Sequence, residues 1–355
     1  MAVIFSANLT ISADSETEID EFLLILPGIS DMGQFDTIQK RLQEELEEMN
    51  RIIVSSLETS NELMNRIVTS YLQTKGKQIR PILVILSARF FGGMNPHVLH
   101  AGAALEMLHN ASLIHDDIVD ETSLRRGVPT INSVWGNHIA VLVGDFFVSN
   151  ALAAGIRTGN LSIISALSDL GCELSLGEID QICNARGHSL DYESYFGMIR
   201  KKTASLFMNC VRMGAEAVGA TEEQYAPLID YAELLGLCFQ IKDDIFDYFS
   251  DPKIGKPTGN DLREGKVTLP LLYALQNAPE DEARPMRNLI TRGDLSDSEI
   301  AGLIEFAKRN GGIEYAFRTM RDMQSRADEI LLPYPDSDYK QSFRDIFEFI
   351  ISRDK

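Results

Sequence analysis

The sequence predicts an all-α fold, a single large helical bundle around a deep central cavity. Apolar residues recur at intervals of three and four along most of the chain, which is the period of amphipathic helices. We find no run of alternating apolar and polar residues bounded by turn residues, so a sheet is not expected. Proline and glycine nowhere gather into a linker, and the 355 residues are therefore expected to form an extension at 1–34 and one domain at 35–355.

The helices of the first half follow from periodicity and end signals. Residues 35–57 carry a three-four apolar rhythm, and residues 81–93 begin with a proline and stop at a glycine pair. Residues 95–121 form a long apolar segment with Asn95 as the expected cap. Residues 131–156 are apolar on nearly every face, which predicts a central helix buried on all sides. Further helices are expected at 160–184, 191–218, 221–249, 267–277, 297–309, 312–331 and 336–352.

Composition and charge exclude several classes of partner. The net charge of -19 and the pI near 4.7 argue against nucleic acid and against an anionic membrane surface. The four cysteines show no C-x-x-C pair, which predicts buried thiols in a reducing, cytoplasmic setting. No Lys or Arg precedes Lys40, so the N-terminal segment lacks the basic region of a signal peptide.

Two acidic triplets share one spacing. Asp116, Asp117 and Asp120 lie within five positions, and the first and last share a helix face. The same spacing recurs in Asp243, Asp244 and Asp247, again after a strongly apolar helical segment. Like charges this close repel, and the cost rises as the dielectric falls.

A divalent cation explains the repulsion in both triplets. Mg²⁺ favours oxygen ligands and completes its shell with water and substrate phosphates. We therefore expect the two triplets to face each other across one cavity and to hold several Mg²⁺ ions together with a diphosphate or triphosphate ligand.

Basic residues accompany the triplets at helix boundaries. An acidic protein needs local positive charge to admit an anionic substrate, and guanidinium groups suit phosphate oxygens. The candidates are Lys75, Lys77, Arg80, Arg125, Arg126, Lys201, Lys202, Lys256 and Lys266.

Together these segments resemble the trans-isoprenyl diphosphate synthases (polyprenyl synthetases). "DDIVDETSLRRGVPT" is similar to the first aspartate-rich motif, DDxxD followed by a basic pair, and "QIKDDIFDY" to the second. "GKQIRP" resembles GKRxRP with Gln78 in place of an arginine, and "KTASLF" and "GKPTGNDLREGKVTLP" match two further segments. The resemblance runs in order over residues 75–270 and implies the isoprenoid synthase type of helical bundle.

The resemblance also implies roles for individual residues. The six aspartates would hold about three Mg²⁺ ions, with Asp116, Asp120 and Asp243 as the principal ligands. Arg125, Lys202 and Lys266 would bind the allylic diphosphate, and Lys256 belongs to the same basic set. Thr203 and Gln240 would lie beside the developing carbocation. Isopentenyl diphosphate would be bound by Lys77, Arg80, His109 and Arg126. A homodimer and transient membrane contact for product release are further implications.

Product length depends on the residues that precede Asp116. Residues one turn earlier lie about 5.4 Å deeper along a helix, roughly one isoprene unit. Bulky aromatics at this place form a floor in short-chain members of the family, whereas this chain has the small residues Ala111 and Ser112. We expect a long-chain product, of the kind used as a quinone side chain, with a farnesyl or geranylgeranyl diphosphate synthase as the alternative.

Three other classes of protein fit the sequence less well. Class I terpene cyclases typically carry an Asn/Ser/Glu-type second metal motif, whereas this chain has a second DDxxD. A ferritin-like di-iron protein needs Glu-x-x-His on two helices, and only His109 has a glutamate, Glu106, three positions before it. A non-catalytic subunit of a heteromeric synthase would be expected to lose aspartates from one motif, and both motifs are intact.

Overall fold

The predicted helical bundle is confirmed. The computed structural model describes residues 31–73, 76–125, 127–249 and 258–353. The first half contains α2 (Asp31–Arg41), α3 (Gln43–Leu57), α4 (Glu62–Leu72), α5 (Ile79–Phe91), α6 (Pro96–Val119), α7 (Ile131–Trp135), α8 (Asn137–Arg157) and α9 (Leu161–Gly187). The second half contains α10 (Tyr192–Ile199), the π-helix η1 (Arg200–Ala204), α11 (Ser205–Ala217), α12 (Glu222–Phe246), α13 (Asn260–Arg263), α14 (Leu269–Asn277), α15 (Glu280–Arg292), α16 (Asp297–Arg309), α17 (Gly312–Leu331) and α18 (Asp338–Ser352).

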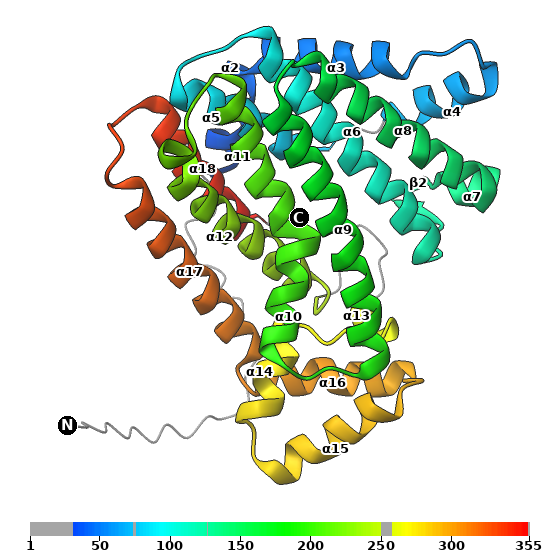
Figure 1. Cartoon of the computed structure of the whole chain (residues 1–355). Coiled ribbons are helices and arrows are strands. Elements are labelled where there is room, and N and C mark those ends of the chain that lie inside the picture. Colours follow the sequence, from blue (N-terminus) through cyan, green and yellow to red (C-terminus); the bar gives the residue numbers. More distant parts are fainter. Residues whose placement is uncertain (1–30, 74–75, 126, 250–257, 354–355) are drawn as a thin grey trace.

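The long helices form the main body, and α14, α15 and α16 form a smaller layer at one end of it (Figure 1). In the main body α6 packs against α8, α5 and α11, while α12 packs against α11, η1 and α17. One large apolar cluster fills this body, and a second, separate cluster lies between α14, α15 and α16. The ends of α6 and α12 that carry the acidic triplets thus belong to the main body.

Local signals explain several helix ends. The side chain of Asn95 accepts hydrogen bonds from the backbone N–H groups of His97 and Val98, as expected of an N-cap. Thr221 and Ser296 each form a capping box at the start of α12 and α16. Gln78 precedes α5 with a φ of 56°, a left-handed conformation.

Two of the predicted helices are interrupted, and one of these is less buried than predicted. The segment 35–57 breaks at Leu42 into α2 and α3. Because α2 begins at Asp31, residue 35, where the domain was expected to start, lies within this helix. The segment 131–156 breaks at Gly136, whose φ of 80° a helix cannot accommodate. The prediction that this segment is buried on all sides is wrong, because Leu142 and Ile156 on α8 are 59% and 62% exposed.

Further differences concern short elements and cysteines. The segment 191–218 consists of α10, η1 and α11, and α4, α13 and α15 were not predicted. A hairpin of two-residue strands, β1 (Leu124–Arg125) and β2 (Val128–Pro129), follows α6 where no sheet was expected. All four cysteines are free, but Cys172 and Cys183 are exposed, contrary to the prediction of buried thiols. The first thirty residues of the expected extension lie outside the described residues.

Glycines allow two helices to approach η1 closely. A Cβ atom on Gly236 of α12 would lie 2.5 Å from the Ala204 Cα, and one on Gly177 of α9 would lie 2.7 Å from the Lys202 backbone nitrogen. Neither neighbour is a flexible side-chain end, so a larger residue must displace a helix backbone. The absence of a side chain at these two glycines lets η1 pack closely between α9 and α12.

We predict that Gly236→Ala destabilises the protein, although alanine is the better helix former. Overpacking against η1 costs about 1–3 kcal/mol, which exceeds the gain of about 0.5–1 kcal/mol from removing a glycine within a helix. Gly302→Ala on α16 is the matched control, because no atom lies within 4 Å of its added Cβ. Urea unfolding should show a loss for the first variant and a small gain for the second, and equal gains would contradict the close approach.

Candidate active site

The first triplet lies where α6 ends. Asp116 and Asp117 occupy the last turn, and Asp120 is the C-cap residue. The C-terminus of a helix carries partial negative charge, so carboxylates here are disfavoured by the helix dipole as well as by one another. Asp117 is buried and accepts hydrogen bonds from Arg125, at 2.8 Å from Nε and 2.7 Å from Nη2.

The second triplet lies at the C-terminal end of α12 and is held in detail. Asp244 accepts hydrogen bonds from the Tyr195 hydroxyl at 2.6 Å and from the Gln240 amide at 2.8 Å. Asp247 accepts the backbone N–H groups of Asn260 and Asp261 at 3.1 and 3.0 Å, which ties the end of α12 to α13. Asp243 forms an ion pair with Arg353, which follows α18.

Two lysines connect the two triplets. The Nζ atom of Lys266 lies 4.0 Å from the Oδ1 atom of Asp120, and Lys266 also lines a cavity of about 190 Å³ together with Asp244. Lys202 lines the same cavity, and its positive charge acts to lower the pKa of Asp116. Through these two lysines the first triplet lies next to the cavity that Asp244 of the second triplet lines.

The π-helix η1 presents two of the predicted residues to this site. Single-turn π-helices within longer helices often occur at functional sites. Lys202 donates hydrogen bonds to Glu178 and, at 3.1 Å, to the Gln181 side-chain oxygen, both on α9. The Thr203 hydroxyl donates to the Gln240 side-chain oxygen at 2.7 Å, so Thr203, Gln240 and Asp244 form one chain of hydrogen bonds.

The site has unusually high carboxyl pKa values. Burial raises the pKa of Asp116 to about 6, and the charges of Glu178 and Asp120 act in the same direction. Burial also raises the pKa of Asp244 to about 7, with Asp243 and Asp247 adding to the shift. The pKa of Asp261 is raised well above its ordinary value by burial and by Asp244. The negative charge of this region is thus only partly offset by the protein.

Carboxylate oxygens that lack enough positive charge fit a hard divalent cation such as Mg²⁺. No three carboxylate, imidazole or thiolate groups in the described ranges are arranged to hold an ion by themselves. Mg²⁺ commonly needs only one or two carboxylates when water and phosphate oxygens complete its shell. The donor set therefore fits Mg²⁺ that is bound together with a diphosphate.

Other predicted residues lie on a neighbouring side of α12. The ammonium of Lys77 lies 4.9 Å from the Phe349 ring centre, and the guanidinium of Arg80 lies 5.5 and 5.8 Å from the ring centres of Phe207 and Phe239. These cations do not line the cavity that contains Asp244. Lys75, Arg126 and Lys256 lie outside the described residues.

The remaining predicted residues lie within α6. His109 and Ala111 are buried where α6 packs against its neighbours. The Ser112 hydroxyl donates a hydrogen bond to the His109 carbonyl at 2.8 Å. Ala111 belongs to the main apolar cluster, as do Met107 and Ala104 one and two turns deeper.

Sequence reasoning missed the residues that hold the others in place. They are Glu178, Gln181, Tyr195, Asp261 and Arg353. Glu178 directly follows Gly177, and Gln181 comes three positions after Glu178. This spacing places Glu178 and Gln181 on one face of a helix. No sequence signal links Arg353 to Asp243, because the contact joins residues 110 positions apart.

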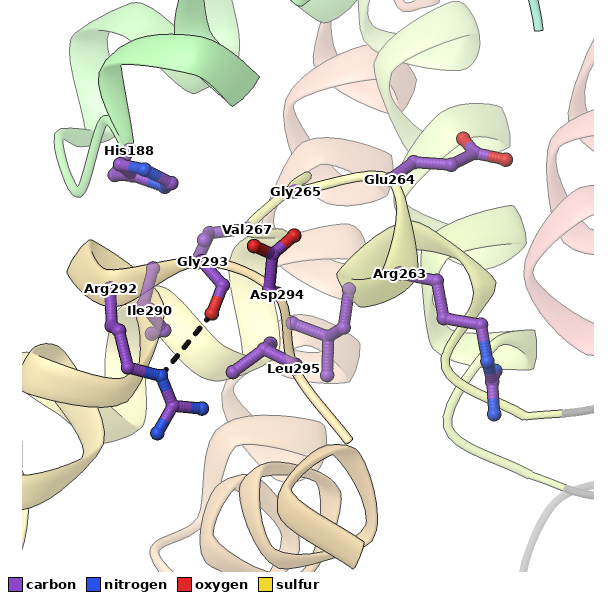
Figure 2. A pocket seen from close by; sticks show the side chains of 11 residues that line it. His188, Arg263, Glu264, Gly265, Val267, Ile290, Arg292, Gly293, Asp294 and Leu295 are labelled. Atoms are coloured by element: carbon purple, nitrogen blue, oxygen red, sulfur yellow. Dashed lines mark hydrogen bonds between the residues drawn. The ribbon is translucent and has the colours of Figure 1, made fainter. Parts of the chain in front are cut away.

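A larger cavity of about 500 Å³ is bordered by residues of the segment 262–267 and of the segment 290–295 (Figure 2). It shares Val267 with the smaller cavity, but none of the six aspartates lines it. Arg263 and Arg292 at its border are engaged in ion pairs with Asp297 and Glu299. We therefore place the candidate active site at the smaller cavity.

Comparison with known proteins shows the family of this chain. The polyprenyl synthetase family model matches residues 61–306, and the chain belongs to this family of prenyltransferases. Octaprenyl diphosphate synthase of Haemophilus influenzae is 32% identical over 313 residues, which cover 88% of this chain and 95% of that protein. A short chain isoprenyl diphosphate synthase of Methanothermobacter thermautotrophicus is 34% identical over 288 residues, covering 79% and 87%.

The fold is also similar to solved structures. A polyprenyl synthase from Caulobacter crescentus, crystallised with calcium and isoprenyl diphosphate, aligns with a TM-score of 0.83 and 30% identity. The alignment covers 90% of this chain and 98% of that one.

We predict that Asp116→Asn stabilises the protein in the absence of added Mg²⁺. At pH 8 the wild-type carboxylate is ionised against its raised pKa of about 6, and a neutral amide should increase the free energy of unfolding by about 1–2 kcal/mol. Because the folded-state pKa is raised, the wild-type protein regains stability as the pH falls through about 6. The advantage of the variant should therefore shrink at pH 5 and vanish near 3.8.

Urea unfolding at pH 8 and pH 5 measures this difference. Asp230→Asn is the control, because Asp230 lies on the same helix as the second triplet but is exposed. Its effect should stay within about 0.5 kcal/mol at both pH values. A destabilised Asp116→Asn variant at pH 8 would contradict the proposed charge strain.

Proposed function

We propose that this protein catalyses the Mg²⁺-dependent head-to-tail (1′-4) condensation of isopentenyl diphosphate with an allylic prenyl diphosphate. The observation that carries the proposal is the position of Lys202 and Lys266 between two acidic triplets. Binding of a diphosphate favours both positively charged side chains and metal ions. This site has lysines next to carboxylates that can bind metal.

The six aspartates, Asp116, Asp117, Asp120, Asp243, Asp244 and Asp247, are the proposed metal ligands, directly or through water. Bound Mg²⁺, about three ions as in the family, would neutralise the charge of the departing pyrophosphate. As the resemblance implies, Asp116, Asp120 and Asp243 are the principal ligands, and Asp117, Asp244 and Asp247 have supporting roles. Both carboxylate oxygens of Asp244 and of Asp247 already accept hydrogen bonds from the protein.

The reaction breaks one bond and forms another. Lys202, Lys266 and Arg125 bind the allylic diphosphate and stabilise the charge that develops as the allylic C–O bond ionises. The hydrogen-bonded oxygens of Thr203 and Gln240 lie beside the developing carbocation. The double bond of isopentenyl diphosphate attacks this cation, which forms a C–C bond, and a proton is lost to the released pyrophosphate.

Orientation of the second substrate falls to a different group of side chains. Lys77, Arg80, His109 and Arg126 are the proposed ligands of isopentenyl diphosphate. Lys77 and Arg80 each lie against an aromatic ring, which limits the motion of their long side chains. Holding the two substrates in one orientation contributes to the rate in the same way as an intramolecular reaction.

Turnover is the direct test of the proposed function. Purified protein incubated with farnesyl diphosphate, isopentenyl diphosphate and Mg²⁺ should release pyrophosphate, and a chelator should stop the reaction. Lys202→Ala should lower kcat by a factor of about 100, because a preorganised charge at the leaving group is removed. Absence of turnover by the wild-type protein alone would favour a non-catalytic subunit instead.

We propose a long-chain product, beyond geranylgeranyl. The octaprenyl synthase is among the relatives of this chain, and Ala111 and Ser112 offer little side-chain bulk below Asp116. The short-chain relative supports the alternative of a shorter product.

We predict that Ala111→Phe shortens the product, because a large ring one turn below Asp116 blocks the growing chain. Ala274→Phe is a matched control in α14: the alanine is equally buried, but it belongs to the second apolar cluster. Chromatography of the products should show a shift for Ala111→Phe only. The same product distribution in both variants would rule out a channel along α6.

The assembly proposed is a homodimer formed through α8 and α9. By length and composition α8 could cross a membrane, but only 39% of its most apolar window is buried, and it packs against α6 and α9. The exposed apolar residues of the two helices are Val141, Leu142, Leu152, Ile156, Leu161, Leu176 and Ile179. A second copy would cover this surface, and a monomeric mass in light scattering would contradict the dimer.

We place the protein in the cytoplasm, with transient membrane contact for release of an insoluble product.

A further inference from the structure

Arg353 is a buried cation outside all of the sequence motifs. Its side chain is 7% exposed, and its Nη2 atom donates to the Asp243 Oδ1 atom at 2.5 Å and to the Phe239 carbonyl at 3.1 Å. The guanidinium also lies 4.2 Å from the centre of the Phe239 ring. Three contacts to one turn of α12 thus fix this guanidinium.

The partner of Arg353 is only partly enclosed. The Asp243 side chain is 41% exposed, whereas the neighbouring Asp244 is buried. One oxygen of the Asp243 carboxylate is therefore bound from the protein interior, while the group as a whole still meets solvent. A carboxylate held in this way has a defined orientation, as the ligating carboxylates of metal sites do when outer groups hydrogen bond to them.

Charge balance favours the same role. Asp243 and Asp244 lie in the last turn of α12 and Asp247 is its C-cap residue, and Asp261 of α13 donates its backbone N–H to Asp247, so four acidic side chains come from one small region. Arg353 adds a positive charge to this region from α18. An arginine remains charged throughout the physiological pH range, so this contribution is constant.

We propose that Arg353 is a positioning residue, which orients the Asp243 carboxylate and thereby sets the affinity of the second triplet for Mg²⁺. The inference rests on the proposed function in that it assigns Asp243 to the metal site. It concerns metal affinity, so it can be measured without turnover.

Metal binding by Arg353→Gln is the test. Isothermal titration with Mn²⁺ in the presence of inorganic pyrophosphate should show an affinity lower by a factor of about 10, since loss of an outer partner of a metal ligand costs about 10–100-fold. Arg353→Lys keeps the charge without the planar fork and should lie between the variant and the wild type. Arg344→Gln is the control on the same helix, because Arg344 pairs with Asp328 of α17, away from the site.

A double-mutant cycle separates positioning from folding. If Arg353 acts through Asp243, Arg353→Gln should have no further effect on metal affinity in an Asp243→Asn background. An unchanged Mn²⁺ affinity in Arg353→Gln and Arg353→Lys would overturn the inference. So would a KM for isopentenyl diphosphate that rises about tenfold while metal affinity stays constant, because Arg353 would then bind the substrate itself. A wild-type protein that binds Mn²⁺ as described but fails to turn over would reject the proposed function and leave this inference standing.

Discussion

Repulsion between carboxylates at two helix ends is the constraint on which the rest of the structure depends. Six aspartates lie at the C-terminal ends of α6 and α12, where both their neighbours and the helix dipoles disfavour negative charge. The protein offsets only part of this charge, through Lys202, Lys266, Arg125 and Arg353. The remainder is the charge that, in the proposed function, bound Mg²⁺ would offset together with a diphosphate.

The surrounding fold keeps this unfavourable site in place. The main apolar cluster buries the inner faces of α6 and α12, and glycines at 177 and 236 allow α9 and α12 to approach η1. The π-helix then directs Lys202 and Thr203 to the end of α12. The packed apolar core between the helices stabilises the fold, whereas the crowded carboxylates at the helix ends destabilise it. The proposed functional site therefore coincides with the strained part of the structure.

Periodicity and motif spacing were sufficient to predict the helical class and the position of each triplet at the end of a long helix. They were not sufficient for features that depend on tertiary packing. The apolar pattern of a segment such as 137–157 is the same whether its own chain or a second copy covers it. The sequence therefore did not reveal the exposed face of α8. Arg353 and Glu178 were missed because their partners are remote in sequence.

The central claim is that the two triplets share metal ions around one diphosphate. Diffraction at the manganese absorption edge, from crystals grown with Mn²⁺ and a thio analogue of farnesyl diphosphate that cannot ionise, tests this most directly. Anomalous density is expected beside Asp116 and Asp120 and beside Asp243, with the diphosphate between them. Density at one triplet only, or a diphosphate bound away from Lys202 and Lys266, would contradict it.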